Sequence, residues 1–303
     1  FEDNAEFGYG MLLAQQAIRD GLKAKVEEVA ANENATAEVK AACQEWLDTF
    51  SVGATNGVAT DKLVAALENI DCPTCKDIVN NKDFLAKKSQ WVFGGDGWAY
   101  DIGFNGVAHV LASGKDINIM VFNTEVYSNT GGQSSKATPT GAVAQFAAGG
   151  KEVKQKDLAA IAMSYGYVYV AQISMGADMN QTIKAIAEAE AYPGPSLIIA
   201  YAPCINHGIK KGMAKAQTEE KLAVQSGYWN LFRFNPAAEG KKFSLDCKPA
   251  TVDYQEFIKG EVRYTSLALK NPARAEKLFA KAEQNAKDKY AYLEKLVTLY
   301  DEK

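Results

Sequence analysis

The sequence lacks the features that mark several large classes of protein. It contains no run of about 18 consecutive apolar residues, so no segment is predicted to span a membrane. Lys and Arg number 33 against 37 Asp and Glu, which gives a net charge of −4. Both signs are mixed along the chain, and the basic stripe that binding to a phosphate backbone requires is missing. We therefore expect neither a membrane nor a nucleic acid as a partner.

Cysteine is also scarce. The chain has five, an odd number, and this argues against a disulfide scaffold and predicts a reducing compartment, such as the cytoplasm. The chain begins at Phe1 without a basic segment or a small-residue cleavage site, so we do not expect its first helix to be a signal peptide. Because an acidic cluster runs directly into helix with no Met before it, we expect that residues precede Phe1 in the complete polypeptide.

The composition is that of a globular protein with a sizeable core, since 47% of the 303 residues are hydrophobic and 23% are charged. Apolar residues at three- and four-residue spacing predict helices at about 4–31, 36–50 and 60–70, followed by loop and a short helix to residue 90. We interpret residues 1–90 as a helical N-terminal segment with a variable insertion, packed on the same domain as the rest of the chain.

After residue 90 short apolar segments alternate with helical ones. Strands are predicted at 91–93, 117–123, 167–173 and 196–201, with helices at 98–113, 158–165 and 181–191. This alternation predicts an α/β fold, an open parallel sheet with helices on both faces. We assign residues 91–233 to this core and 234–303 to a mainly helical C-terminal extension, whose last helix is expected to lie on the surface over 271–300.

Two polar loops follow the first two predicted strands. One is Gly95-Asp96-Gly97 and the other begins at Asn123-Thr124, about one βαβ unit later. Glycines let backbone amides approach a phosphate, and a carboxylate and a hydroxyl are oxygen ligands that suit Mg²⁺. The loops therefore predict a site for Mg²⁺ and a diphosphate at the carboxyl ends of the strands. The alternative is two tight turns in which Asp96 only caps a helix.

Longer strings extend this interpretation. The segments GDGWAYDIG, NTEVYSNTGGQSSKATPTGA, YGYVYVAQISMG and GPSLIIAYAPCINHG strongly resemble the C-terminal thiamine diphosphate-binding region of pyruvate:ferredoxin (or flavodoxin) oxidoreductases. The resemblance begins at FEDNAEFGYGM and is dense from about residue 91 to 233, whereas residues 30–88 and the C-terminal tail are less distinctive. The YSNTGGQSSKATP loop is the specific part, because other thiamine diphosphate enzymes share the GDG motif without it.

The resemblance implies roles for individual residues. Mg²⁺ would be held by Asp96, the Thr124 side chain and the Val126 carbonyl, and Asn129 would be a catalytic residue near the substrate. Cys204 would be one ligand of a [4Fe–4S] cluster, whose other three cysteines would precede residue 1. The residues expected to bind the cofactor are Gly95, Asp96, Gly97, Trp98, Asn123, Thr124, Val126, Tyr127, Thr130, Gly131, Gly132 and Gln133.

The activity that the resemblance implies is the oxidative decarboxylation of pyruvate to acetyl-CoA and CO₂ in anaerobic metabolism. Electrons would pass through iron–sulfur clusters to ferredoxin or flavodoxin, with coenzyme A as co-substrate. The partners would be the remaining domains or chains of a homodimeric enzyme, without which this chain would not turn over pyruvate. Alternatives are an oxidoreductase for 2-oxoglutarate or a branched-chain 2-oxoacid, a simple thiamine diphosphate decarboxylase, and a non-catalytic thiamine diphosphate-binding fragment or subunit.

Other reactive side chains carry weaker signals. Cys72 and Cys75 do not match the cluster cysteines of that family, and we interpret them as a thiol pair with no function or a local redox role. His109 is expected to be an ordinary helix residue. His207 follows Cys204 closely and lies nearer the implied chemistry, but the sequence leaves its role open.

Overall fold

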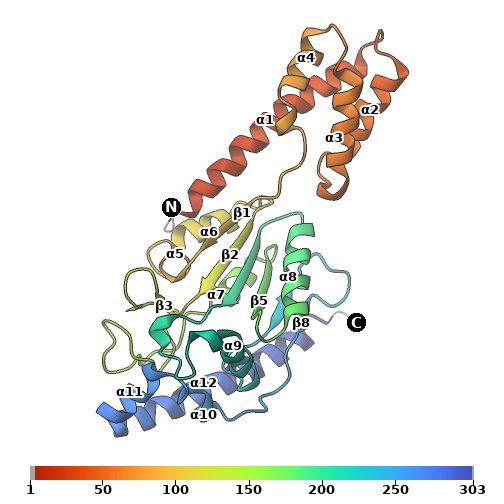
Figure 1. The fold of residues 1–303 in the computed structure, drawn as a ribbon. Helices are drawn as coiled ribbons and strands as arrows, with labels where there is room; N and C mark the ends of the chain where they lie inside the picture. The colour runs from red at the N-terminus through yellow and green to blue at the C-terminus, as the bar shows by residue number, and fades with distance from the viewer. Residues whose placement is uncertain (1–3, 302–303) are drawn as a thin grey trace. The chain divides into compact units, whose positions relative to one another are not determined.

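The computed structural model describes residues 4–301. They form two compact units, one of Phe7–Gln90 and one mainly of the residues from Trp91 onward. Figure 1 shows the helices of the first unit in red and orange and the sheet of the second in yellow to cyan. No helix among the described residues is both long enough and apolar enough to cross a membrane.

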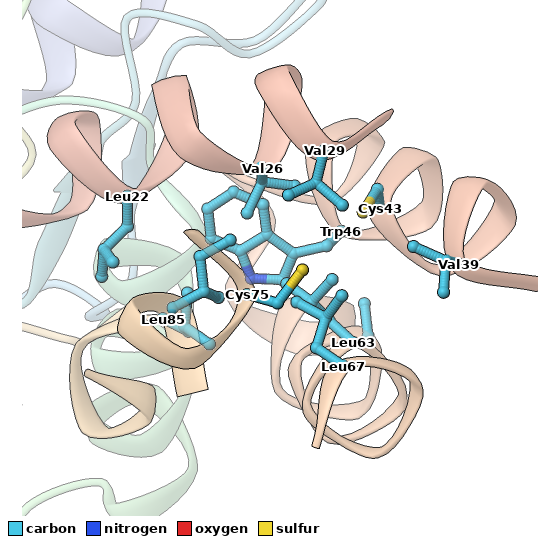
Figure 2. Close-up of a cluster of buried hydrophobic side chains, with 12 residues drawn as sticks. Leu22, Val26, Val29, Val39, Cys43, Trp46, Leu63, Leu67, Cys75 and Leu85 are labelled. Carbon is cyan, nitrogen blue, oxygen red and sulfur yellow. The ribbon is translucent and has the colours of Figure 1, made fainter. Parts of the chain in front are cut away.

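The first unit is built from α1 (Ala5–Ala31), α2 (Ala37–Asp48), α3 (Gly53–Leu67) and α4 (Pro73–Asn80), with a 3₁₀ turn at Lys82–Phe84. Trp46 lies at the centre of its hydrophobic core, fully buried among aliphatic side chains from all four α-helices (Figure 2). The Trp46 indole donates a hydrogen bond of 3.1 Å to the Thr60 hydroxyl. This unit therefore has a core of its own. That residues 1–90 pack on the domain that carries the sheet stays a prediction.

The second unit contains a six-stranded sheet in the order β1-β2-β6-β5-β7-β8. The strands β1 (Trp91–Gly94), β2 (Asn118–Asn123), β6 (Ser196–Tyr201) and β5 (Tyr169–Ile173) are parallel neighbours. The α/β prediction is confirmed for this part. Two antiparallel strands, β7 (Phe232–Phe234) and β8 (Phe243–Leu245), extend the sheet beyond β5, so it is mixed and not purely parallel.

Helices cover both faces of the sheet. On one face, α8 (Met179–Ala191) packs Ala185 and Ala189 against Ala171 and Ile198. On the other, α7 (Leu158–Met163) contacts the same two strands, and its Leu158 lines a cavity together with Ile199. Because β5 and β6 are buried on both faces, their sequences are nearly continuous apolar runs.

The predicted helix over 98–113 is wrong in one respect, because it is two helices. The first, α5, covers Asp96–Tyr100, and the second, α6, covers Phe104–Ala112. Asp101 lies at the break with a non-helical backbone, and its carboxylate accepts hydrogen bonds from the Lys136 backbone (3.2 Å) and side chain (2.8 Å). A tertiary contact therefore ends α5. Gly114, with φ +67°, ends α6 as expected.

The C-terminal part continues as α9 (Ala216–Gln225), α10 (Tyr254–Ile258), α11 (Val262–Lys270) and α12 (Pro272–Leu299). The long α12 is the predicted surface helix, and it buries Leu278, Phe279 and Leu296 on its inner side. The sheet includes β8, which lies beyond residue 233. The division into a core of 91–233 and an extension of 234–303 stays a prediction.

Candidate functional site

The two predicted loops meet at the carboxyl ends of β1 and β2. Asp96 begins α5 two residues after the end of β1, and Thr124 directly follows β2. Asp96 Oδ1 accepts hydrogen bonds from the Thr124 backbone N–H at 3.1 Å and from the Thr124 hydroxyl at 3.4 Å. The same hydroxyl lies 3.0 Å from the Val126 carbonyl oxygen. The structure thus brings together the carboxylate, hydroxyl and carbonyl oxygens that the sequence singled out as a Mg²⁺ site.

Asp96 is almost completely buried, with 3% of its surface exposed. Its second oxygen accepts a hydrogen bond of 2.7 Å from Ser135. Burial raises the pKa of Asp96 to about 7, against the lowering effect of the Ser135 hydrogen bond, and the nearby charge of Glu125 raises it further. An acid in this position is stabilised as a carboxylate when a cation binds beside it.

The YSNTGGQSSKATP loop contains a small hairpin. Strands β3 (Val126–Tyr127) and β4 (Gln133–Ser134) pair in antiparallel fashion, and Asn129 lies exposed between them. Thr130 and Gln133 hydrogen-bond each other, with the Thr130 hydroxyl 2.6 Å from Gln133 Oε1 and its carbonyl accepting from Gln133 Nε2 at 2.8 Å. These two side chains therefore shape the loop, and Asn129 lies on its exposed surface.

The remaining predicted binding residues have different environments. Gly95 faces open space, so its backbone is accessible to a ligand. Trp98 is buried with its ring against Gly94, where an added Cβ would lie 2.3 Å from a ring carbon, so it supports β1 from inside the fold. The buried Asn123 Oδ1 has no hydrogen-bond partner among the described residues. Contact of each with the cofactor stays a prediction.

Cys204 lies just beyond β6, the neighbour of β2, and is 6% exposed. Asn206 donates to its sulfur twice, from the backbone at 3.5 Å and from the side-chain amide at 3.4 Å. The same Asn206 side chain packs on Gly132 of the hairpin, where an added Cβ would lie 2.7 Å from Asn206 Cγ. The predicted cluster ligand and the hairpin are therefore in contact through one residue.

His207 connects the loop of Cys204 to the loop of Thr124. Its Nε2 is 2.7 Å from the Thr124 carbonyl oxygen, and its Nδ1 lies 3.5 Å from the Cys204 backbone N–H, which donates to it. Burial, and secondarily Arg263, hold the pKa of His207 well below its ordinary value. The ring is therefore neutral, with its proton on Nε2 directed at Thr124. His207 is a positioning residue for the loop that carries Thr124.

A buried charge network lies behind these loops, and sequence reasoning missed it. Arg263 of α11 binds Glu125 Oε2 through Nη2 at 2.7 Å and Glu261 Oε2 through Nε at 2.7 Å. All three side chains are at most 1% exposed. Tyr228 adds a hydrogen bond of 2.6 Å to Glu125, whose backbone has φ +62°. The network fixes the residue between Thr124 and Val126, and only Glu125 belongs to a recognisable motif.

His207 offers a direct test of loop positioning. Replacing His207 by Leu removes the hydrogen bond to Thr124, and we expect magnesium-dependent affinity for thiamine diphosphate to fall by about 10- to 100-fold. Glutamine can donate to the same carbonyl, so His207→Gln should recover most of the affinity. Titration of the cofactor-depleted protein with thiamine diphosphate measures both variants. Equal losses of affinity in His207→Leu and His207→Gln would show that the hydrogen bond to Thr124 is not the cause of the loss.

Gly132 offers a second test. In Gly132→Ala, the backbone at φ +83° is strained and the new methyl group must displace Asn206, so we expect a loss of stability of about 1–3 kcal/mol. Gly114→Ala is the matched control, since Gly114 also has positive φ but faces open space. Thermal unfolding of both variants separates the two effects. If both lose the same stability, backbone strain alone explains the result and the contact with Asn206 contributes nothing.

Comparison with known proteins shows which families the chain resembles. The family model of the C-terminal TPP binding domain of thiamine pyrophosphate enzymes matches residues 82–200. The chain is 51% identical over 301 residues to the pyruvate-flavodoxin oxidoreductase of Klebsiella pneumoniae, which covers 98% of this chain and 26% of that protein. It is 53% identical over 306 residues to the pyruvate:ferredoxin oxidoreductase of Moorella thermoacetica, with the same coverage. The resemblance to these oxidoreductases is confirmed.

The chain spans about a quarter of the length of these relatives. Its matched domain, 82–200, includes the Asp96 and Thr124 loops and the Asn129 hairpin. Cys204 and Arg263 lie beyond that domain but within the nearly full-length similarity to the two oxidoreductases. Among solved structures, a 2-oxoglutarate:ferredoxin oxidoreductase from Magnetococcus marinus is similar at 20% identity and a TM-score of 0.36, over 51% of this chain and 46% of that chain.

Proposed function

We propose that this chain supplies the Mg²⁺ and thiamine diphosphate site of an enzyme that oxidatively decarboxylates pyruvate to acetyl-CoA and CO₂. The observation that carries the proposal is the convergence of Asp96, Thr124 and the Val126 carbonyl within hydrogen-bond distance at the ends of two adjacent parallel strands. Ligands of open α/β sheets bind at this edge. The similarity to pyruvate oxidoreductases over 98% of the chain supports the choice of reaction.

The donor set fits the metal. Mg²⁺ prefers oxygen ligands and is commonly bound by one or two carboxylates together with phosphate oxygens. Asp96 would provide the charge, and Thr124 and Val126 would provide neutral oxygens. Gly95 faces open space, which leaves its backbone accessible to the diphosphate. When bound, thiamine diphosphate supplies the electron sink for decarboxylation, and the protein binds and orients it.

Residues of this chain would have separate tasks around the cofactor. Ser135 and Thr124 hold the Asp96 carboxylate in place, and His207 holds the Thr124 carbonyl. Asn129, exposed on the hairpin, would hydrogen-bond the substrate near the reactive end of the cofactor. Cofactor contacts of Gly97, Trp98, Asn123, Tyr127, Thr130, Gly131, Gly132 and Gln133 belong to the same proposal.

Cys204 would be one ligand of a [4Fe–4S] cluster that accepts electrons from the site. Such clusters are held by sets of four cysteines. The described residues contain no group of three or more His, Cys, Asp or Glu side chains suited to a metal, so the other ligands would come from another part of the enzyme. Asn206, which donates to the Cys204 sulfur, would tune the potential of the cluster.

The enzyme as a whole would work as a homodimer in the cytoplasm of an anaerobe or facultative anaerobe. Ferredoxin or flavodoxin would receive the electrons, and coenzyme A would take the acetyl group. In this chain, residues 91–233 would form the cofactor-binding core, with 1–90 and 234–303 as additions. Since the relatives are about four times longer, other domains or chains would complete the active site.

Anaerobic reduction of a viologen dye tests the proposal. With the complete enzyme we expect reduction that requires both pyruvate and coenzyme A, and no comparable rate with 2-oxoglutarate or a branched-chain 2-oxoacid. The 303-residue chain alone is expected to bind thiamine diphosphate without turnover. A preference for another 2-oxoacid would move the assignment to that substrate. Bound cofactor without reduction by any 2-oxoacid would instead favour a non-catalytic binding subunit.

A further inference from the structure

The helical unit carries a pair of cysteines that the proposed reaction does not use. Cys72 is the N-cap of α4, with Pro73 at the first helical position, and Cys75 follows in the first turn. The Cys75 backbone N–H donates to the Cys72 sulfur at 3.5 Å. Ser, Thr, Asp and Asn are the residues preferred at an N-cap. A cysteine here places a thiol at the positive end of a helix, one turn from a second thiol.

The two thiols differ in exposure. Cys72 is partly exposed, whereas Cys75 is 3% exposed and belongs to the hydrophobic core around Trp46. Figure 2 shows Cys75 beside Trp46. Hydrogen bonds from the backbone and side chain of Cys75 lower the pKa of Cys72. Burial raises the pKa of Cys75 to about 11. One sulfur is thus partly exposed with a lowered pKa, and its neighbour is a shielded thiol with a raised pKa.

The spacing allows the two sulfurs to join. Residues three apart on a helix have Cβ atoms about 5–6 Å apart, and a disulfide needs about 3.5–4.5 Å, so Cys72 must approach Cys75 by about 1–2 Å. Cys72 has an extended backbone outside the helix, so its side chain can turn toward Cys75 without breaking α4. The third cysteine of this unit, Cys43, is fully buried, and burial raises its pKa to about 11. It does not complete a metal site with the pair, since no such group occurs in residues 4–301.

We infer that Cys72 and Cys75 form a redox-active dithiol that closes to a disulfide by exchange with a small-molecule or protein disulfide. In this exchange the Cys72 thiolate attacks one sulfur of the disulfide RSSR, forms a mixed disulfide and releases the first thiolate. Cys75 then loses its proton and attacks the Cys72 sulfur, which releases the second. One dithiol and one RSSR become one intramolecular disulfide and two RSH, with two electrons passed to RSSR.

The inference predicts unequal reactivity. Under reducing conditions at neutral pH, iodoacetamide should alkylate Cys72 at least about tenfold faster than Cys75 or Cys43, because the thiolate is the reactive form. Cys43 is the matched control, since it lies in the same core and is fully buried. Peptide mass spectrometry of the complete enzyme gives all three rates. Equal rates for Cys72 and Cys43 would overturn the assignment of Cys72 as the attacking thiol.

Equilibration with glutathione and its disulfide tests the pair itself. The complete enzyme is held anaerobically at graded ratios, quenched in acid and labelled with a maleimide after denaturation. We expect Cys72 and Cys75 to lose labelling together in one two-electron step, while Cys43 keeps its label. In Cys75→Ser, or in Cys75→Ala if the serine disturbs the core, glutathione should remain attached to Cys72. In Cys72→Ser, Cys75 should stay reduced.

Three results would contradict the inference: labelling of both cysteines at every ratio, independent transitions of the two, or a disulfide between Cys75 and Cys43. None of these outcomes depends on thiamine diphosphate or pyruvate. The proposal of a redox pair can therefore be refuted without affecting the proposed catalytic site, and the reverse also holds.

Discussion

Replacing Asp96 by Asn is expected to abolish magnesium-dependent retention of thiamine diphosphate while leaving the fold intact. Asp96 provides the negative charge among the three converging oxygens, and asparagine keeps its shape without that charge. Replacing a residue that hydrogen-bonds a metal ligand typically lowers metal affinity by about 10- to 100-fold. Loss of the charge on the ligand itself should therefore lower it by at least about 100-fold. Stability should hold or rise, because burying an ionised carboxylate is unfavourable.

The experiment is a titration of the cofactor-depleted complete enzyme with thiamine diphosphate at fixed Mg²⁺, together with thermal unfolding in the absence of both. Asp101→Asn is the matched control. Its carboxylate lies at the end of the same short helix and pairs with Lys136 at 2.8 Å, outside the set of three oxygens. We expect its affinity to stay within about threefold of the parent. Wild-type affinity in Asp96→Asn would show that Asp96 only caps α5.

The site was predictable to the extent that it is local. Each loop directly follows an apolar strand, and parallel neighbours bring their carboxyl ends to one edge, so the approach of Asp96 to Thr124 follows from the pattern of the chain. Secondary structure was predictable for the same reason where the spacing of apolar residues is regular, as in α1 and α12. The confirmed α/β architecture rests on these local signals.

Long-range contacts explain what the sequence did not predict. The break between α5 and α6 depends on hydrogen bonds between Lys136 and Asp101, which leave no trace in the spacing of apolar residues. The antiparallel β7 and β8 are three residues each, too short for a clear alternation. Arg263 and Glu125 are 138 positions apart, and in sequence they resemble solvent-exposed charges. Pairing across such a distance becomes visible only when burial is known.

Replacing Arg263 by Leu is expected to cause the largest loss of stability. The variant would leave Glu125 and Glu261 buried without their cation, and breaking a buried ion pair from one side costs about 3–5 kcal/mol. Arg274→Leu is the matched control, because Arg274 also lies in a C-terminal helix and pairs with Glu152 at 2.8 Å, but at the surface. Exposed pairs contribute about 0–1 kcal/mol. The loss in the free energy of unfolding, measured with urea, should therefore be several-fold larger in Arg263→Leu than in Arg274→Leu.

The loss in Arg263→Leu should also depend on pH. Burial already raises the pKa of Glu261 from 4.5 to about 7, against the lowering effect of Arg263. An acid whose pKa is higher in the folded state favours folding most when the pH is below its unfolded pKa, and this contribution is lost as the pH rises through the folded pKa. Without Arg263 the folded pKa rises further. In the variant, keeping Glu261 as the neutral acid costs little at pH 5, whereas at pH 8 it opposes folding because Glu261 is ionised in the unfolded chain.

We therefore expect Arg263→Leu to lose at least about 1 kcal/mol more stability at pH 8 than at pH 5, relative to the parent at each pH. The double variant Glu261→Gln/Arg263→Leu separates the causes, because glutamine cannot ionise and should remove most of this pH dependence. A loss of the same size at both pH values would mean that Glu261 is not the group left uncompensated. In that case the interaction of Arg263 with Glu125, which holds the loop between Thr124 and Val126, would account for the whole effect.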